Sequence, residues 1–496
     1  MTQDDLITLL GISSPLPEFH FHAVTEDSRR AKAGTLFIAV QGVKSDGHAY
    51  VEAAVEAGAC AILGNRPGIT AMAGRPYIYY REPRRATGLI AHALNGNPTR
   101  NQCVLGITGT NGKTSTACLV QKVMTLAAGP CANFGTVGYD FVDARMDAPH
   151  TTPFGEDLAA LFVEADKHGC RHIVMEVSSH SLEQERVAGV DFNVAAFTNL
   201  TQDHLDYHQD MESYLRAKLR LFEKVRESLT EGTGPWPRFG VVNMEDPCAP
   251  RFAAVLEGNC HTYGDNGSVR AEGLRLFMDG AAFRLVTPWG EGDAHIRLVG
   301  RHNVLNALCA ASMTAGLGIP LDKVIHGLDA LPCVPGRFEP VSAGQPFQVI
   351  VDYAHTDDGL RNALTAARAV CSGRIIVTFG CGGDRDKGKR PKMGAVAAEL
   401  ADFTIVTSDN PRTEEPFRIL LDVELGLQHR GKRKGDDYLV IESRREAISR
   451  AISLAGPGDL VLIAGKGHET YQIIGKERHH FDDREEALKA LRGEAP

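Results

Sequence analysis

Residues 106–116 read Gly-Ile-Thr-Gly-Thr-Asn-Gly-Lys-Thr-Ser-Thr. They follow the apolar run 103–105 and precede residues 117–126, whose pattern predicts a helix. A strand, a glycine-rich turn and a helix start form a phosphate-binding loop, because backbone N–H groups and the positive end of the helix dipole meet an anion there. In such a loop Lys113 contacts the β- and γ-phosphates, and the hydroxyl of Thr114 contacts Mg²⁺.

The glycines of this stretch depart from the common spacing of a phosphate-binding loop. That spacing has a glycine where Ile107 stands, and here the glycines are Gly106, Gly109 and Gly112. An alternative interpretation is a glycine-rich turn with an incidental lysine. The strand before the turn and the helix after it favour the phosphate-binding interpretation.

Length and charge limit the class of protein. A chain of 496 residues accommodates about three domains. A composition of 43% hydrophobic and 23% charged residues is typical of globular proteins. The net charge of -9 argues against a nucleic-acid backbone as the main partner, so no nucleic acid is expected. We also expect the chain to act as a monomer.

Cysteine usage and the N-terminus predict the compartment. Eleven cysteines are scattered along the chain, and no two of them form a Cys-x-x-Cys pair. Reduced thiols in a cytoplasm are the simplest interpretation, because a chain of this length does not need disulfides. Residues 1–5 are acidic and no apolar run follows them, so no signal peptide is expected. No apolar run approaches the length of about 18 residues that a membrane-spanning helix needs, so no membrane association is expected.

Short apolar runs at helical spacings predict an α/β fold in three domains, 1–98, 99–332 and 333–496. The first is a small α/β domain. The second contains the glycine-rich loop and a mostly parallel sheet, and the third a doubly wound sheet. The turn-forming residues at 95–98 and 331–336 are the predicted linkers.

Three strands of the central domain end in residues that can carry chemistry. Residues 172–175 lead to Glu176, residues 194–197 lead to the segment with His204, and the first strand leads to Lys113. Ligands of open parallel sheets bind just beyond the carboxyl ends of the strands. These three residues are therefore predicted to line one crevice.

The last third of the chain repeats this pattern, and polar loops follow its predicted strands. The strands and the polar residues after them are 349–351 with Asp352, 375–379 with Arg385, 404–407 with residues 409–412, and 460–464 with Gly465 and Glu469.

Two residues of the central crevice are candidate metal ligands. Glu176 suits Mg²⁺ because hard cations prefer carboxylate oxygens, and the alternative is a surface glutamate at a strand end. His204 could bind a metal or position a phosphate, although a single histidine is more often structural.

Lys218 lies on a predicted helix, 214–222, and shares a face with Leu215, Leu219 and Phe222. An ammonium on an apolar face is costly, so the pKa of Lys218 is expected to fall. The neutral amine could be a nucleophile, or it could add CO₂ and become a carbamate that binds a metal. The alternative is a lysine whose ammonium extends to solvent.

Arg412 follows Asp409, Asn410 and Pro411 in a loop that the proline stiffens. Its guanidinium can bind a carboxylate through two parallel hydrogen bonds. Arg385, in a second such loop, would double that capacity. The alternative is a pair of surface arginines in turns.

A series of motifs resembles the Mur ligase family over nearly the whole chain, and the family's shorter glycine-rich loop accounts for Ile107. The motifs are 109–114 (Gly-Thr-Asn-Gly-Lys-Thr), 176–180 (Glu-Val-Ser-Ser-His), 199–200 (Asn-Leu), 203–206 (Asp-His-Leu-Asp), 300–303 (Gly-Arg-His-Asn), 336–339 (Gly-Arg-Phe-Glu), 352–356 (Asp-Tyr-Ala-His-Thr) and 409–412 (Asp-Asn-Pro-Arg).

The resemblance implies a UDP-sugar-binding domain, a central ATP-binding domain and a C-terminal Rossmann-like domain for an amino acid. It implies an ATP-dependent, ADP-forming amide ligase of peptidoglycan precursor synthesis that activates a carboxylate as an acyl phosphate. The implied partners are ATP, Mg²⁺, the UDP-N-acetylmuramoyl dipeptide and meso-diaminopimelate.

The resemblance also implies the site residues. The ATP site comprises Gly109, Thr110, Asn111, Gly112, Lys113, Thr114, Ser115, Asn303, Arg337 and Asp352. The Mg²⁺ ligands are Thr114, Glu176, His204 and Lys218, the last as a carbamylated lysine, and Lys113, Lys218, His204 and Glu176 are the catalytic residues. The UDP-sugar peptide contacts Ser28, Thr151, Thr152, Ser178, Gln184 and Arg186. Diaminopimelate contacts Arg385, Asp409, Asn410, Pro411, Arg412, Gly465 and Glu469.

Two stretches depart from the family pattern. After Thr356 the family has proline and then aspartate, whereas this chain has Asp-Asp-Gly at 357–359, which predicts a looser loop. Lys44 and Ser45 also differ from the expected residues, which leaves the uracil-side contacts open.

Three other functions remain as alternatives. The first is the lysine-adding ligase of the same family, against which residues 409–412 argue. The second is a folate or poly-amino-acid ligase on a related scaffold, which a complete first domain with residues 27–29 disfavours. The third is a P-loop switch that hydrolyses ATP without ligation, in which Lys218 has no role.

Overall fold

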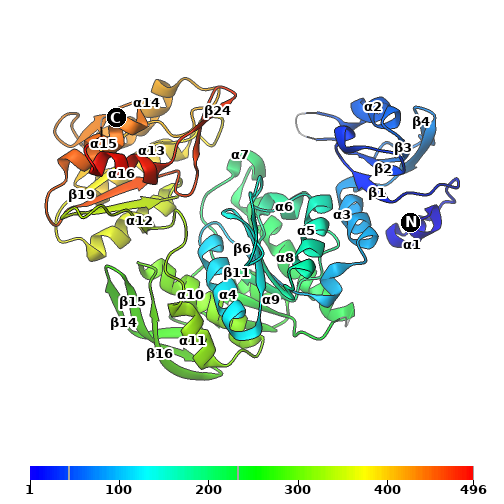
Figure 1. Cartoon of the computed structure of the whole chain (residues 1–496), viewed down its shortest axis with the longest axis horizontal. Helices are drawn as coiled ribbons and strands as arrows, with labels where there is room; N and C mark the ends of the chain where they lie inside the picture. The colour runs from blue at the N-terminus through cyan, green and yellow to red at the C-terminus, as the bar shows by residue number, and fades with distance from the viewer. Residues whose placement is uncertain (43–44, 232–233, 495–496) are drawn as a thin grey trace.

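The computed structural model describes residues 1–42, 45–231 and 234–494 (Figure 1). Lys44, one of the predicted departures from the family pattern, lies outside these residues. The chain folds into three successive α/β segments, here called N-terminal, central and C-terminal. The main sheet of each segment is mostly parallel, so the predicted α/β class is confirmed.

The N-terminal segment carries a sheet of order β1-β2-β3-β5-β4, in which only β4 runs antiparallel to its neighbour. Every residue of β2 is buried, as is typical of a parallel strand covered on both faces. The elements are α1 (Gln3–Leu10), β1 (Ala23–Thr25), η1 (Ser28–Arg30), β2 (Thr35–Ala39), η2 (Gly47–Tyr50), α2 (Val51–Glu56), β3 (Ala59–Gly64), β4 (Ala71–Met72), β5 (Arg75–Tyr79), α3 (Pro83–Leu94) and η3 (Pro98–Asn101).

The central segment is built on an eight-stranded sheet of order β13-β12-β11-β6-β10-β7-β8-β9. Strand β6 lies between β11 and β10 and runs parallel to both. The elements are β6 (Cys103–Thr108), α4 (Lys113–Ala128), β7 (Cys131–Gly135), β8 (Gly138–Asp140), β9 (Arg145–Met146), α5 (Gly155–Lys167), β10 (His172–Glu176), α6 (Ser179–Glu183), β11 (Val194–Phe197), α7 (Leu205–His208), α8 (Met211–Glu231), β12 (Phe239–Asn243), α9 (Ala249–Val255) and β13 (Cys260–Tyr263). The carboxyl ends of β6, β10 and β11 therefore meet at one edge, as predicted.

A separate antiparallel sheet, β14-β15-β16, follows the central sheet. Partly buried and exposed residues alternate along the second half of β14, as expected for a sheet with one face in solvent. This sheet packs on α11, and α10 packs on α4 beside the glycine-rich loop. The elements are β14 (Arg270–Phe277), β15 (Gly280–Thr287), β16 (Gly290–Ile296), α10 (Arg301–Gly316) and α11 (Leu321–Asp329).

The C-terminal segment carries a sheet of order β17-β18-β22-β19-β20-β21, parallel except at β17, and a hairpin of β23 and β24. The four predicted strands of this segment correspond to β18, β19, β20 and β22. The elements are β17 (Glu339–Pro340), β18 (Gln348–Asp352), α12 (Asp357–Val370), β19 (Ile375–Phe379), α13 (Lys389–Leu400), β20 (Phe403–Val406), α14 (Pro416–His429), β21 (Tyr438–Val440), α15 (Arg444–Leu454), β22 (Leu460–Ala464), β23 (Tyr471–Ile474), β24 (Glu477–His480) and α16 (Asp483–Leu491).

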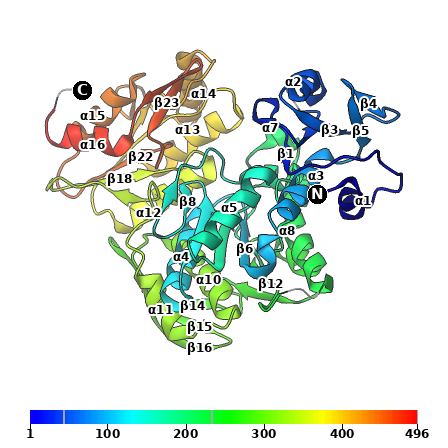
Figure 2. The same cartoon turned by 45° about the vertical axis from the view of Figure 1, so that its right-hand side comes forward.

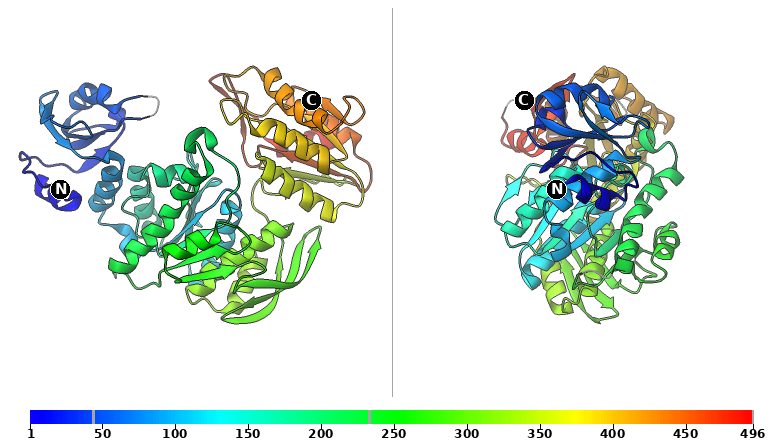
Figure 3. Two further views of the ribbon diagram at one scale, coloured as in Figure 1. Left: turned by 180° about the vertical axis from the view of Figure 1, so that it is seen from behind. Right: turned by 90° about the vertical axis from the view of Figure 1, so that its right-hand side faces the viewer.

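The N-terminal and C-terminal sheets lie at opposite ends of the long axis, with the central sheet between them (Figure 1). The view turned by 45° and the view from behind show the same order (Figures 2 and 3). The C-terminal segment lies beside α10, and the N-terminal segment lies beside α5, on which α3 packs. The carboxyl edge of the central sheet can therefore be approached from both outer segments.

The helix predicted for residues 117–126 is longer than expected. It begins at Lys113, because Gly112 has a φ of 86° and ends the turn, so that the last residues of the glycine-rich loop form the first helical turn. All eleven cysteines are free thiols. In the part of the chain that the structure describes, no helix combines the length and the apolar character required to cross a membrane.

Candidate functional site

The glycine-rich loop connects β6 to α4 and is fixed by the residues that follow β11. The backbone N–H of Asn111 donates to the Asn199 side chain over 2.9 Å, and the Thr198 hydroxyl donates to the Asn111 carbonyl over 2.6 Å. Gly112 is required here, because a Cβ at this position would lie 2.4 Å from Oδ1 of Asn306. Ile107, the anomalous position, is a buried residue of β6 and not part of the loop.

Lys113 lies at the start of α4, where its ammonium donates to two loop carbonyls. The distances are 2.7 Å to Gly109 and 2.8 Å to Thr110. Burial lowers the pKa of Lys113, and Glu176 opposes this shift. The ammonium is therefore held inside the loop that would surround the phosphates of a nucleotide.

Glu176 is almost fully buried at the end of β10 and gathers hydroxyl groups around its carboxylate. The Thr114 hydroxyl lies 3.0 Å from both carboxylate oxygens, and the Thr136 hydroxyl and backbone N–H lie at 3.1 and 2.7 Å. The surface-glutamate interpretation is therefore wrong. A carboxylate group beside a threonine hydroxyl is a donor set that suits Mg²⁺.

Lys218 is 1% exposed on α8, so the interpretation of an ammonium reaching solvent is wrong. Its Nζ lies 4.3 Å from the centroid of the Tyr214 ring. Burial and the charge of Lys113 lower the pKa of Lys218 well below its ordinary value. The amine is therefore suited to remain neutral and to react with CO₂.

His204 precedes α7 and has a φ of 56°, a backbone conformation that residues other than glycine rarely adopt. Its ring packs at 4.8 Å between centroids against His180, and its Nε2 lies 3.5 Å from the carboxylate of Asp203. Burial lowers the pKa of His204, and the charge of Asp203 acts in the opposite direction. A neutral imidazole is the form that binds metals.

The metal candidates form two adjoining groups around Lys113. Thr114 and Glu176 touch each other, and His204 and Lys218 both approach the ring of Tyr214, at 6.1 Å between ring centroids and 4.3 Å from Nζ. Within the described ranges, no three histidine, cysteine, aspartate or glutamate side chains cluster as a metal site by themselves. The carboxylate and hydroxyl present still fit Mg²⁺ by their chemistry, because hard cations prefer oxygen ligands.

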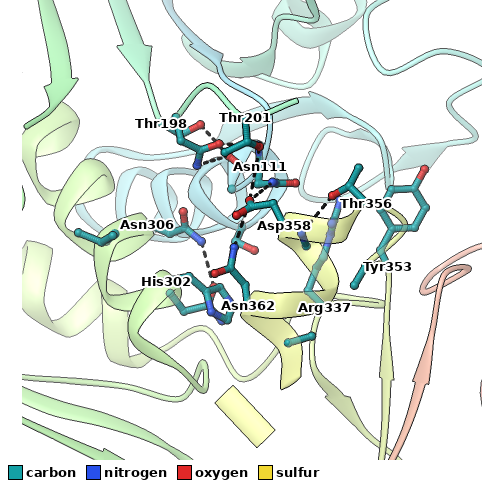
Figure 4. A pocket seen from close by; sticks show the side chains of 18 of the residues that line it. Asn111, Thr198, Thr201, His302, Asn306, Arg337, Tyr353, Thr356, Asp358 and Asn362 are labelled. Carbon is teal, nitrogen blue, oxygen red and sulfur yellow. Dashed lines mark hydrogen bonds between the residues drawn. The ribbon is translucent and has the colours of Figure 1, made fainter. Parts of the chain in front are cut away.

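A cavity of about 220 Å³ lies between the glycine-rich loop, α10 and the start of the C-terminal segment (Figure 4). The predicted ATP-site residues that line it are Asn111, Gly112, Ser115, Asn303, Arg337 and Asp352. Asn306, which the sequence analysis did not select, lies beside Gly112 and donates to Asn303 over 3.0 Å. The sequence could have indicated Asn306, because it lies three residues after Asn303 and therefore on the same face of a helix.

Arg337 brings the C-terminal segment into contact with the glycine-rich loop. Its Nη2 donates to the Thr114 hydroxyl over 3.1 Å, and its guanidinium lies 4.5 Å from the centroid of the Tyr353 ring. Its Nε is buried and has no hydrogen-bond partner among the residues described. An unsatisfied guanidinium N–H beside a phosphate-binding loop suits a phosphate oxygen.

Asp352 holds the turn that presents Arg337. Its two carboxylate oxygens accept the backbone N–H groups of Phe338 and Ala354, at 2.7 and 2.8 Å. Three of the ATP-site predictions, Asn303, Arg337 and Asp352, are thus placed around one cavity although they are far apart in the sequence.

Five of the six residues predicted for the UDP-sugar peptide form one polar cluster. The Thr152 hydroxyl and the Ser178 N–H are 3.1 Å apart, and Arg186 donates to the Thr152 carbonyl and to the Gln184 amide over 3.0 and 2.7 Å. Thr151 joins this cluster through the Thr136 hydroxyl at 3.1 Å. Burial and the nearby Arg84 lower the pKa of Arg186 to about 10.

Ser28, the sixth residue, lies on the N-terminal segment in η1. The same short helix contains Arg30, which bonds Glu156 of α5 over 2.6 Å. An open cavity of about 230 Å³ lies between the two segments and includes Gln184 and Tyr207 on its central side. Ser28 therefore lies on the segment that faces the cluster, without a described contact to it.

The two arginine loops of the C-terminal segment lie side by side. The N–H of Gly383 donates to the Asn410 carbonyl over 2.9 Å, and Nη1 of Arg412 donates to the Gly383 carbonyl over 2.8 Å. The Arg385 side chain is exposed and extends from the same turn. A Cβ at Gly382 would lie 2.8 Å from Nη1 of Arg412 and 3.8 Å from Cγ of Arg385, whereas Nη1 of Arg385 donates to the Asp384 carbonyl over 3.1 Å. The two loops are adjacent, and joint binding of a carboxylate by both arginines stays a prediction.

Arg412 is half-buried and has a φ of 53°. Its backbone N–H and carbonyl bond Ile473 and Gly475 of the β23–β24 hairpin, at 3.1 and 2.7 Å. This hairpin, rather than Pro411 alone, fixes the loop. The sequence analysis did not predict the hairpin.

Gly465 and Glu469 follow β22 and face Asp409 and Asn410. The Asn410 amide donates to Oε2 of Glu469 over 2.9 Å, and Lys466, which was not predicted, donates to the same oxygen over 3.0 Å. The sequence carried a signal for Lys466, namely a lysine between two glycines directly after a buried strand.

The stretch 357–359 is not the looser loop that the sequence predicts. Thr356 caps α12 by accepting the N–H of Gly359 over 3.0 Å, and Asp357 occupies the first helical position. An acidic residue in the first turn is favourable because it faces the positive end of the helix dipole. Asp357 therefore replaces the family's proline without loss of the helix start.

Asp358, the next residue, contacts the glycine-rich loop. Its carboxylate accepts the Asn111 amide over 2.7 Å and the Thr201 hydroxyl over 3.4 Å (Figure 4). Like Arg337, it links the C-terminal segment to the central one. The sequence alone gave no reason to pair it with Asn111.

Comparisons with known proteins agree along the chain. The models of the Mur ligase middle domain, the Mur ligase glutamate ligase domain and the Mur ligase family catalytic domain match residues 107–314, 336–467 and 20–94. The UDP-N-acetylmuramoyl-L-alanyl-D-glutamate--2,6-diaminopimelate ligase of Geobacter metallireducens is 45% identical, over 94% of this chain and 93% of its own. The protein of the same name from Bacillus licheniformis is 44% identical, over 95% of this chain and 94% of its own.

A solved structure of a protein with the same name is 31% identical, covers 98% of both chains and superposes with a TM-score of 0.69. These matches cover all three segments of the chain. The chain belongs to the Mur ligase family.

Proposed function

We propose that the chain is an ATP-dependent, ADP-forming amide ligase. It adds meso-diaminopimelate to the D-glutamyl carboxylate of UDP-N-acetylmuramoyl-L-alanyl-D-glutamate in peptidoglycan precursor synthesis. The names of its relatives at 44 and 45% identity support this activity. The observation that carries the proposal is the contact of Arg337 with Thr114, which joins the amino-acid segment to the phosphate-binding loop.

We assign one substrate to each segment. Residues 1–98 bind the UDP-sugar, residues 99–332 bind ATP, and residues 333–496 bind diaminopimelate. The free thiols support a reducing compartment, the cytoplasm.

The first chemical step transfers the γ-phosphate of ATP to the D-glutamyl carboxylate. Lys113 and the unpaired Nε of Arg337 stabilise the negative charge that develops on the transferred phosphoryl group. The cluster of Thr152, Ser178 and Arg186 orients the peptide so that its carboxylate meets the phosphate in line. The product is an acyl phosphate, and ADP leaves.

Thr114, Glu176, His204 and Lys218 are the residues that would hold Mg²⁺, with Lys218 as a carbamate. When bound, Mg²⁺ supplies positive charge that neutralises phosphate oxygens. The buried neutral amine of Lys218 supports the carbamate, because only an unprotonated amine adds CO₂.

The second step is attack of a diaminopimelate amine on the acyl carbon, which forms the amide and releases phosphate. Arg412 binds the carboxylate at the far end of diaminopimelate, and Glu469 binds the ammonium beside it. Lysine lacks that carboxylate, so the guanidinium would be left without its partner. The penalty is on the order of several kcal/mol where such a group is buried.

ATP-dependent phosphate release in the presence of the UDP-muramoyl dipeptide tests the proposal. Diaminopimelate should stimulate release far more than lysine or other amino acids. Equal or greater stimulation by lysine would identify the lysine-adding enzyme instead. Release that is independent of both co-substrates would support the P-loop switch.

A further inference from the structure

A lysine that the mechanism does not use lies buried in the loop after β22. Lys466 is 0% exposed, and its ammonium donates to Oε2 of Glu469 over 3.0 Å and to Oδ1 of Asn410 over 3.3 Å. The ring of Tyr471 lies 5.4 Å from its Nζ. A buried ammonium persists only where partners compensate its desolvation, so these contacts define its place.

The partners of Lys466 belong to two loops that bind the amino acid. Asn410 precedes Pro411 and Arg412, and its Oδ1 also accepts the N–H of Ile473 over 2.9 Å. Glu469 comes from the loop after β22. Lys466 therefore joins the loop that presents the guanidinium to the loop that presents the carboxylate.

The close approach of these loops depends on Gly465. Its φ is 119°, and a Cβ at this position would lie 2.8 Å from a carboxylate oxygen of Asp409. Two carboxylates, Asp409 and Glu469, are thereby gathered around one ammonium.

The pKa values of these two carboxylates show how the Lys466 ammonium acts on them. Burial raises the pKa of Glu469, the charge of Asp409 adds to this, and Lys466 opposes both. Against burial, Lys466 and Arg444 keep the pKa of Asp409 below its ordinary value.

Among the described groups that face Glu469 besides Lys466, only Arg444 carries a formal positive charge. The hydroxyls of Tyr353 and Tyr471 are neutral, because burial and the charge of Glu469 raise the pKa of both. Arg444 also acts on Glu469, but it is already paired with Asp483 at 2.7 Å. Lys466 is therefore the main cation that acts on Glu469 among the described residues.

We propose that Lys466 is a positioning and specificity-determining residue, whose ammonium fixes the Glu469 carboxylate against Asn410 for the zwitterionic end of the amino-acid substrate. This inference rests on the proposed function. Both bonds to Glu469 use Oε2, so Oε1 is the oxygen that meets the ammonium of the substrate.

Charge balance explains the effect on specificity. The far end of diaminopimelate has one ammonium and one carboxylate, whereas that of lysine has an ammonium alone. Loss of Lys466 removes one positive charge from the groups that meet this end, which favours the purely cationic end of lysine.

Lys466→Met in the full-length chain tests the proposal, with phosphate release measured at saturating ATP and UDP-muramoyl dipeptide. The KM for diaminopimelate should rise about tenfold, as expected when a hydrogen bond to a charged group is lost. The acid limb of kcat/KM for diaminopimelate should move to higher pH, because Glu469 then protonates more readily. The preference for diaminopimelate over lysine should fall, and the KM for ATP should not change.

Two variants serve as controls. Lys476→Met removes an exposed lysine from the hairpin of the same segment and should alter none of these values. Lys466→Arg keeps the charge and should restore the pH profile. If thermal unfolding shows that Lys466→Met is not folded, Lys466→Gln replaces it, since glutamine can still donate to Glu469 without a charge.

The outcomes separate the two proposals. If the wild-type chain does not turn over with diaminopimelate, the proposed function fails. If the wild type does turn over, and the neutral variant keeps the wild-type KM, pH profile and lysine discrimination, the role of Lys466 is overturned.

Discussion

At the scale of single residues, Lys113 supplies the positive charge that the proposed mechanism assigns to phosphoryl transfer. Its ammonium rests on the carbonyls of Gly109 and Thr110. Lys113→Ala should lower kcat about 100-fold or more, because a positive charge aimed at the transferred phosphoryl group is lost. Phosphate release measures this, and Lys122→Ala on the same helix is the control. Activity near the wild-type level would remove Lys113 from the transition state.

Lys218 is the second residue whose burial makes a specific prediction. Lys218→Ala should abolish turnover, because no carbamate can form at this position. Short carboxylates added to the assay should restore part of the activity by occupying the space of the carbamate. The control is Lys224→Ala, which changes a lysine on a different face of α8 and should remain active. No recovery at any carboxylate concentration would count against the carbamate.

In the proposed mechanism, Arg412 binds the far carboxylate of the amino acid. Arg412→Lys should raise the KM for diaminopimelate by roughly 10-fold or more, since an ammonium cannot form two parallel bonds to a carboxylate. The KM for ATP should stay unchanged. Arg418→Lys, an exposed position on α14, is the matched control. An unaltered KM for diaminopimelate would place Arg412 outside the site.

At the scale of elements, the start of α12 replaces the family's proline with a capped acidic turn. Thr356→Ala should lower the free energy of unfolding by about 1 kcal/mol, because the N–H of Gly359 loses its acceptor. Asp357→Pro should change it by less than about 1 kcal/mol. Proline is compatible with the first helical position, and Thr356 has an extended ψ of 161°. Chemical denaturation measures both free energies of unfolding. A larger loss for Asp357→Pro than for Thr356→Ala would contradict this account.

At the scale of the whole molecule, the C-terminal segment contacts the glycine-rich loop directly. Asp358 accepts the Asn111 amide over 2.7 Å, Arg337 bonds Thr114, and Lys392 of α13 bonds Gln202 over 2.6 Å. The first two involve residues that line the cavity between the glycine-rich loop and the C-terminal segment, where we propose that ATP binds. Their loss should therefore weaken nucleotide binding rather than fold stability.

Asp358→Ala should raise the KM for ATP several-fold, on the order of a lost hydrogen bond between a carboxylate and an amide. Asn111→Ala should have a similar effect, and the double variant should cost less than the sum of the two, because both remove the same contact. Asp357→Ala is the control at the neighbouring position. Fully additive effects would show that the two residues act separately.

The sequence alone anticipated most of the fold, and it did so where local signals were strong. Apolar runs such as those of β11, β19 and β22 coincide with the observed strands, because fully buried parallel strands have continuous apolar sequences. The antiparallel sheet β14-β15-β16 and the hairpin β23–β24 were not predicted. They have exposed faces and weak patterns, and their pairing depends on packing against α11 and against Arg412.

What the sequence determined by itself was the chemistry: a glycine-rich loop with Lys113, polar residues after strands, and a lysine on an apolar helical face. Those signals are local, and spacing along one strand or helix suffices to read them. Only the tertiary structure decided which distant groups meet, such as Arg337 with Thr114, Asp358 with Asn111, and Lys466 with Glu469 and Asn410. Such pairs come from separate strands and segments, and their distances follow from sheet order and from the packing of one segment on another.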